Sequence, residues 1–371
     1  MYALLFADAG LSTAEISSLF AIWSITGFVL EVPSGVWADA VSRRLLLALA
    51  PLLSGAGYAL WVLAPSYEAF AIGFVLWGAQ GALQSGALEA LVYEELERDG
   101  AADRYPRLMG RATALGTIAA GVATGLAAPV FAAGGFEAVG AGSVLACLLA
   151  AAVGASLPEH RGGQAAGGDA EDAPAGLRAF GAIVRDGARE LRHSKALRGA
   201  VLLVPAVVTV WGSLDEFLPL LAIEAGAAAS DVPLLALLVY AGMAAGGALA
   251  DRVSRMRGRG IATVLAAAAA LLAAGALSGV PAGFAAIALA FCGFQAVTVV
   301  VDARLQAAIE GRARSTVTSL AGLLTEVATI ATFALYGAGS AVASHALLFA
   351  AFAAAYLVVA PCAARVVDRV R

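Results

Sequence analysis

Charged residues are scarce in this chain. Only 13% of its 371 residues are Asp, Glu, Lys or Arg, and 61% are hydrophobic. A soluble domain of this size cannot hide so much apolar surface, because a single core stops growing long before it absorbs it. The composition therefore predicts that lipid is the solvent for much of the outside.

Cysteine and histidine are nearly absent. Cys147, Cys292 and Cys362 stand alone in apolar runs without metal-like spacing, so we expect packing residues. The three histidines lie outside the interiors of the apolar runs, and a membrane enzyme would need a base with a nucleophile, or metal ligands. No nucleotide-binding Gly-rich loop is present either. The sequence therefore predicts no enzyme, no metal, no cofactor and no direct ATP drive.

Long apolar runs are what the chain has in abundance. Runs of about 20 residues, enough to cross a bilayer as helices, occupy 14–38, 44–64, 69–93, 108–132, 136–156, 198–223, 232–250, 260–278, 282–303, 315–340 and 343–364. The first nine residues are apolar but too short to span about 30 Å at a rise of about 1.5 Å per residue. The pattern predicts an all-α integral membrane protein with eleven full spans and a partial first one.

Basic residues set the expected orientation. All 23 Lys and Arg lie in alternate connections, which the positive-inside rule assigns to the cytoplasm, together with the carboxyl terminus. Lys195 is the only lysine, and with the Ala, Gly and Val content this indicates a GC-rich bacterial source and a bacterial cytoplasmic membrane. This topology puts Met1 partway along a helix. We therefore expect about 15 to 20 residues of a first helix upstream, from a misassigned start or a truncation.

One long polar segment, 157–195, separates residues 1–156 from residues 196–371, which we expect to be two helix bundles. It opens as a flexible linker over 161–174. If residues 177–192 form a helix, apolar side chains lie on one face and arginines largely on the other. We expect a helix that lies along the inner membrane surface, the alternative being an ordinary solvated helix.

The segment that ends the first span carries a motif: Gly35, Asp39, Ser42, Arg43 and Arg44. A degenerate copy follows in the second half, and each residue is separated from its counterpart by the same number of positions. The copy consists of Gly247, Asp251, Ser254 and Arg255. This duplication predicts two copies of one unit, the internal symmetry of many secondary transporters.

The motif resembles the signature loop between the second and third helices of the major facilitator superfamily, with Ser42 in place of the usual second glycine. The resemblance implies two pseudo-symmetric six-helix bundles that rock about a central site, a monomer, and a loop that closes the cytoplasmic side. The residues expected at this cytoplasmic gate are Gly35, Asp39, Arg43, Arg44, Glu89, Gly247, Asp251, Arg255 and Asp302.

The residue types in this gate have a physical rationale. Gly35 lets two helices approach closely, and Asp39 offers a carboxylate to the amino end of a neighbouring helix. We expect Asp39 to meet the helix start at 314–316 and Arg43 to pair with Glu89 or Glu94. In the second half, Asp251 and Arg255 would face residues 111–113 and Asp302. The alternative is that these are only topogenic charges at helix ends.

Acids inside the spans point most directly to function. Each costs about 2.5 to 3.5 kcal/mol on insertion scales, so it normally faces a water-filled interior or a partner. The four candidates are Glu31, Asp215, Glu216 and Glu326. A low-dielectric cavity disfavours their charged forms, which favours proton coupling. The alternative is a structural role in bonding backbone, Ser or Thr groups.

Aromatic and amide side chains are expected to line the cavity, although they suit plain helix packing nearly as well. These are Trp77, Gln80, Gln84, Trp211, Phe294 and Gln295. Such a lining fits an amphipathic small molecule or drug. The leading hypothesis is therefore proton-coupled efflux by antiport, with a small-molecule substrate, protons and lipid as partners and no nucleic acid.

Two features usual in proton-driven drug antiporters are missing. Trp77 stands where those exporters have an arginine before the pair Gln80-Gly81, and Pro129 is displaced from their Gly-Pro step. Their absence favours the alternative of a symporter or facilitator that imports a small solute. A remote alternative is a non-transporting sensor or scaffold, which would tolerate Glu326→Gln.

Overall fold

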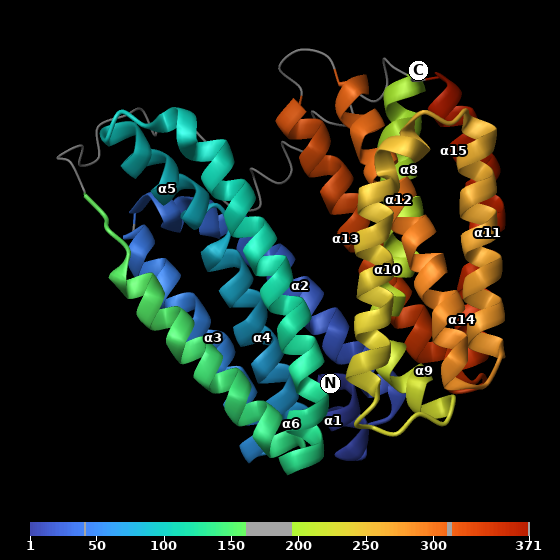
Figure 1. The fold of residues 1–371 in the computed structure, drawn as a ribbon, viewed down its shortest axis with the longest axis horizontal. Helices are drawn as coiled ribbons and strands as arrows, with labels where there is room; N and C mark the ends of the chain where they lie inside the picture. The colour runs from blue at the N-terminus through green and yellow to red at the C-terminus, as the bar shows by residue number, and fades with distance from the viewer. Residues whose placement is uncertain (41, 161–194, 310–313, 370–371) are drawn as a thin grey trace. The chain divides into compact units, whose positions relative to one another are not determined.

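The structure, a computed structural model, describes residues 1–40, 42–160, 195–309 and 314–369. Every regular element in these ranges is a helix (Figure 1), which confirms the all-α prediction. The side chains of 31–40, 195–196, 314–316 and 369 are outside the description. The expected membrane-surface helix at 177–192 also lies outside the described residues.

Contacts divide the chain into two compact units, Leu19–Phe180 and Met1–Ser18 with Gly181–Arg371. We call them the 19–180 unit and the 181–371 unit. The first contains nearly all of α2 (Thr13–Ala40), with α3 (Arg43–Leu63), α4 (Tyr67–Gln84), α5 (Ala87–Arg98), η1 (Ala102–Arg104) and α6 (Tyr105–Ser156). The second contains α1 (Tyr2–Asp8), α8 (Lys195–Asp215), α9 (Leu218–Glu224), α10 (Val232–Ser254), α11 (Gly258–Leu277), η2 (Pro281–Gly283), α12 (Phe284–Ala308), α13 (Arg314–Gly339), α14 (His345–Ala354) and α15 (Tyr356–Arg369).

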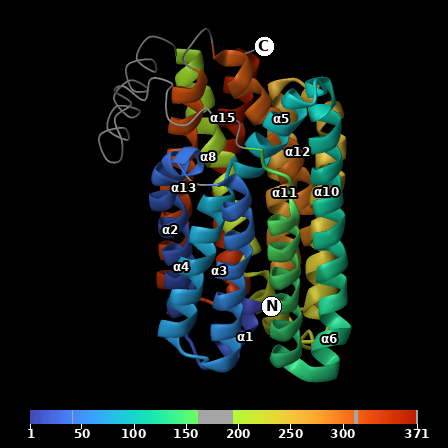
Figure 2. The same cartoon turned by 90° about the vertical axis from the view of Figure 1, so that its left-hand side faces the viewer.

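Helix α6 is two helices joined by a tight reversal. The backbone leaves helical geometry at Gly134 and Gly135, and Gly135 has a φ of 61°. Only glycine adopts this conformation without steric cost. The two arms of α6 run antiparallel (Figures 1 and 2), as the separate predicted spans 108–132 and 136–156 require.

Nine helices in the described part of the chain are long and apolar enough to cross a membrane. This count takes both arms of α6 as one span and does not include α4, whose amides Gln80 and Gln84 lower its hydropathy. The chain is thus a multi-pass helical membrane protein. The predicted number of eleven full spans is not confirmed by this count.

The spans 198–223 and 69–93, each predicted as one helix, are each divided into two helices in the structure. The span 198–223 is interrupted after α8, because Pro219 in α9 lacks an amide hydrogen and its ring clashes with the carbonyl four residues earlier, that of Asp215. The span 69–93 is interrupted between α4 and α5, where Gly86 has a φ of 72°. The first interruption matters most, since it falls at the predicted acid pair.

Helices α10 and α12 of the 181–371 unit touch backbone to backbone. A Cβ atom on Gly242 would lie 2.2 Å from the carbonyl oxygen of Ala288, and one on Gly246 would lie 2.2 Å from that of Cys292. Both distances are far inside van der Waals contact, so only glycine fits. A Cβ atom on the next residue, Gly247, would meet nothing within 4 Å. The close helix approach in this half is therefore made by Gly242 and Gly246, and not by Gly247.

A side-chain hydroxyl bridges the backbone of α8. Tyr356, fully buried at the start of α15, donates from its hydroxyl to the carbonyl of Val207 at 2.8 Å. The same oxygen accepts the amide hydrogen of Trp211 at 3.0 Å. Val207 and Trp211 are one turn apart, and their groups would pair with each other in an undisturbed helix. A side chain inserted at such a point is a recognised cause of helix bending.

Candidate functional site

The acid pair lies where α8 ends. Asp215 is the last residue of α8, and Glu216 stands in the interruption before α9. The hydroxyl of Tyr2, from α1, donates to Oε2 of Glu216. The hydroxyl of Tyr240, from α10, lies beside the side chain of Asp215. Three segments far apart in the sequence therefore converge on two adjacent carboxylates within the 181–371 unit.

Buried polar atoms without partners gather on the last turns of α8. Within the described part of the chain, Oδ1 of Asp215 and the hydroxyls of Thr209 and Ser213 are buried and have no hydrogen-bond partner. An unsatisfied buried polar group costs about 1 to 3 kcal/mol, so such a group calls for an explanation. The end of α8 is therefore a polar site inside an apolar helix.

Sequence reasoning missed four residues of this site: Tyr2, Tyr240, Thr209 and Ser213. The two hydroxyl residues carry a weak signal, since they lie on the same span as the acid pair. Tyr2 and Tyr240 carry none, because only the packing of α1 and α10 against the end of α8 brings them to the carboxylates.

The other two predicted acids are on separate helices. Glu326 lies midway along α13, and its side chain is half-buried. The side chain of Glu31, on α2, is outside the described residues, as are those of Gly35 and Asp39. Their proposed roles therefore stay predictions.

The aromatic residues predicted for the cavity in the second half are packed inside their own unit. Trp211 is 5% exposed and Phe294 is 0% exposed. Their rings stack with centroids 6.5 Å apart, and Nε1 of Trp211 donates to the hydroxyl of Thr298 at 3.3 Å. Gln295 is half-buried. This burial favours the packing alternative for Trp211 and Phe294.

In the 19–180 unit, Trp77 belongs to an aromatic cluster. Its ring stacks on that of Trp23 with centroids 5.0 Å apart, and it meets the ring of Tyr58 in an edge-to-face arrangement with centroids 5.7 Å apart. One turn further along α4, the Gln80 amide nitrogen donates to Oε1 of Gln84 at 2.5 Å. The Ser54 hydroxyl donates to Oε1 of Gln80 at 3.3 Å. The structure thus brings together the two amides and the tryptophan that the sequence singled out.

The motif residues at the start of α3 are held by acids of the same unit. Arg43 forms an ion pair with Glu94 on α5, one of the two acids expected. Glu159, just after α6, accepts hydrogen bonds from the Ser42 hydroxyl and, at 2.8 Å, from the backbone amide of Arg43. This carboxylate caps the amino end of α3, where amide hydrogens lack partners and the helix dipole is positive. Arg44 and Glu89 are exposed.

The second copy of the motif is arranged partly in the same way. Asp368, near the end of α15, accepts a hydrogen bond from the amide of Gly258 at 2.8 Å, and so caps α11 as Glu159 caps α3. Arg255 instead pairs with Asp251 on its own helix at 2.5 Å. Asp302 is exposed, and the expected contact of Arg255 with Asp302 stays a prediction. Residues 111–113 belong to the other unit, so the contact predicted there is also untested.

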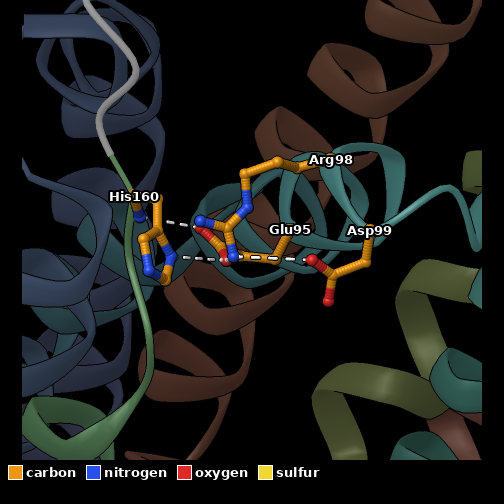
Figure 3. Close-up of polar contacts among 4 residues, drawn as sticks. All are labelled: Glu95, Arg98, Asp99 and His160. Carbon is orange, nitrogen blue, oxygen red and sulfur yellow. Dashed lines mark hydrogen bonds and ion pairs between the residues drawn. The ribbon is translucent and has the colours of Figure 1, made fainter.

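A second polar cluster surrounds the end of α5 (Figure 3). Glu95 accepts the backbone amide hydrogen of His160 at 2.8 Å, contacts Nδ1 of the same histidine at 3.0 Å, and pairs with Arg98 at 2.9 Å. The amide hydrogen bond from His160 is the largest effect, and with Arg98 it lowers the pKa of Glu95 below its ordinary value of 4.5. The cluster ties the segment after α6 to α5.

This pKa shift predicts a pH-dependent contribution to stability. A carboxyl whose pKa falls on folding stabilises the folded state above its unfolded pKa, here 4.5, and loses that contribution as pH falls through the folded value. We expect Glu95→Gln to lower the melting temperature of the detergent-solubilised protein near neutral pH, with the difference from wild type shrinking as the pH falls from 4.5 through the lower folded pKa of Glu95. The exposed neighbour Glu97 supplies the control, Glu97→Gln. A difference for Glu95→Gln that does not shrink as the pH is lowered below 4.5 would contradict this interpretation.

These features together are typical of secondary transporters. The described part of the chain is helical with many apolar spans, the two copies of the motif have similar helix caps, and acids lie within the spans. A family model described as Major Facilitator Superfamily matches residues 1–332. The chain therefore belongs to the major facilitator superfamily, as the motif at Gly35 to Arg44 indicated. A search of curated proteins finds no match.

Solved structures agree with this assignment at the level of fold. The nucleoside transporter NupG is similar with a TM-score of 0.69 at 14% identity, over 98% of this chain and 92% of NupG. A bacterial homologue of the human lysosomal transporter Spinster, inward-facing and unoccupied, gives a TM-score of 0.63 at 16% identity, over 98% and 96%. An autoinhibited POT-family peptide transporter gives 0.67 at 14% identity, over 97% and 89%. The chain has a major facilitator transporter fold.

Proposed function

We propose that this chain is a proton-coupled secondary transporter that exports an amphipathic small molecule by alternating access. The observation that carries the proposal is the pair Asp215 and Glu216, two carboxylates at a helix interruption within an apolar sequence. Ionisable groups at such depth are costly and occur where a transporter binds its ions or its substrate. Interrupted helices are also where such transporters place these sites.

The remaining parts of the mechanism follow from the sequence. Glu326 and Glu31 are further coupling residues, and Trp77, Gln80, Gln84 and Gln295 line the substrate path. The cytoplasmic gate combines Gly35, Asp39, Arg43, Arg44 and Glu89 of the first half with Gly247, Asp251, Arg255 and Asp302 of the second. The protein acts as a monomer in a bacterial cytoplasmic membrane with its carboxyl terminus inside, and residues 157–195 link bundles formed by 1–156 and 196–371.

We infer the substrate class from the side chains and not from the fold. The neighbours in fold are named for nucleosides and for peptides, so likeness of fold does not select between cargo classes. Tryptophan rings beside two amides on α4 suit a molecule with an apolar body and a few hydrogen-bonding groups.

The test follows protons in inside-out vesicles that contain the full chain and an acidic lumen. We expect the addition of lipophilic cations or neutral amphipathic drugs to raise the lumenal pH, because each compound that enters exchanges for protons. Glu326→Gln should abolish the response. Glu68→Gln, an exposed acid in the first turn of α4, is the matched control and should leave the response unchanged.

Two results would overturn export by antiport. Protons that leave the lumen together with a preloaded compound would establish symport, the first alternative. No proton movement and no flux of any compound, in wild type and Glu326→Gln alike, would instead favour a sensor or scaffold.

A further inference from the structure

The two carboxylates of the acid pair are neighbours in sequence but differ in their hydrogen bonds. Glu216 accepts a hydrogen bond at Oε2 from the hydroxyl of Tyr2, which stabilises a carboxylate in its ionised form. Asp215 lies beside the hydroxyl of Tyr240, but its Oδ1 is buried and has no hydrogen-bond partner within the described part of the chain. Asp215 therefore has a buried acceptor that its surroundings leave unsatisfied.

The backbone adds an effect that the two acids share. Asp215 is the last residue of α8, a helix of 21 residues, and Glu216 follows it directly. The carboxyl end of a helix carries a partial negative charge, which disfavours carboxylates beside it. The helix dipole thus opposes a second charge on the pair, and the hydrogen bonds separate the two acids.

Other charged and titratable groups near the pair do not reverse this difference. Those that face it from other helices are the hydroxyls of Tyr2 from α1 and Tyr240 from α10. The two carboxylates repel each other, so a single proton bound by the pair relieves one unit of like charge.

We propose that Asp215 is the proton-binding member of the pair, that Tyr240 is its positioning residue, and that Glu216 stays ionised as the partner of Tyr2. The proposal rests on the proposed proton-coupled function and divides the roles within its site. A hydronium ion gives its proton to Oδ1 of Asp215: one O–H bond of the hydronium breaks to leave water, and a new O–H bond turns the carboxylate into a neutral acid. Release of the proton to water restores the carboxylate, and no other bond changes.

Infrared difference spectroscopy tests this assignment without any substrate. The full chain in lipid nanodiscs is stepped through pH, and the C=O stretch of protonated carboxyl groups is recorded. We expect a titrating band in wild type that Asp215→Asn removes and the isosteric change in its neighbour, Glu216→Gln, leaves in place. A band removed by Glu216→Gln and retained in Asp215→Asn would overturn the assignment, as would a band that neither change affects.

The hydroxyl variants give a second, independent measure. Tyr240→Phe removes a donor to the Asp215 carboxylate, so we expect the apparent proton affinity read from the band to rise about tenfold. Tyr2→Phe should leave the Asp215 band in place. If Asp215→Asn does not fold, the Tyr240→Phe shift decides alone, and an unchanged midpoint contradicts the proposal.

This assignment and the export proposal fail separately. An Asp215 band in a protein that moves no protons in vesicles would leave the proton site standing and end the export proposal. Proton flux that persists undiminished in Asp215→Asn would overturn the assignment and leave export standing.

Discussion

Gly246→Ala should destabilise the protein by about 3 kcal/mol, and Gly246→Leu should prevent recovery of folded protein. A Cβ atom at this position would lie 2.2 Å from the carbonyl oxygen of Cys292, which belongs to the backbone of α12 and cannot rotate away. Helices α10 and α12 must then separate along their whole contact. Overpacking of this kind costs about 1 to 3 kcal/mol and occasionally more.

The neighbouring glycine provides a matched control of opposite sign. A Cβ atom on Gly247 meets nothing within 4 Å, and alanine is favoured over glycine in helices by about 1 kcal/mol. Gly247→Ala should therefore leave the melting temperature unchanged or raise it. Thermal unfolding in detergent micelles distinguishes the two. Equal melting temperatures for Gly246→Ala and Gly247→Ala would show that the helix contact is not as close as described.

Tyr356→Phe should lower the free energy of unfolding by about 2 kcal/mol. The change removes one oxygen that donates to the carbonyl of Val207 and accepts from the amide of Trp211, both buried within α8. Leaving buried backbone groups without partners costs about 1 to 3 kcal/mol. Part of this is recovered if α8 closes its own hydrogen bond between the two residues.

Two measurements check this prediction. Thermal unfolding gives the loss of stability, and hydrogen exchange of the Trp211 amide shows whether the bridge or a closed helix protects it. Tyr93→Phe, at a tyrosine that is 45% exposed on α5, is the control and should change neither. An unaltered melting temperature together with unaltered exchange in Tyr356→Phe would mean that the bridge does not contribute to the free energy of unfolding.

Features that depend on local sequence were predictable. Hydrophobic runs give the helices, because period and length are properties of the segment itself. The pairing of Arg43 with Glu94 was predictable for a similar reason, since a basic residue at the start of one predicted span and an acid just after the end of the next span, 69–93, meet at the same membrane face.

Features that depend on how helices face one another were not. Gly246 and Gly247 are the same residue in adjacent positions, and only the rotation of α10 makes the first a contact and the second open. Tyr2 and Tyr240 are ordinary aromatic residues in apolar stretches until α1 and α10 carry them to Glu216 and Asp215. Residue type alone allowed Trp211 to line a cavity, and only its burial in the structure favours a packing role instead.

The carboxylates that cap α3 and α11 are synthesised long after the helices that they cap. Glu159 is made 117 residues after Ser42, and Asp368 is made 110 residues after Gly258. At a translation rate of about 5 to 20 residues per second, the ribosome takes on the order of ten seconds to supply each cap. Until then the amide of Arg43 at the start of α3 and that of Gly258 at the start of α11 lack these carboxylate partners. Each half therefore completes the cap beside its motif only after its own last helix has been synthesised. The cap of the first half forms before that of the second, so synthesis that stops between the two leaves only the first cap in place.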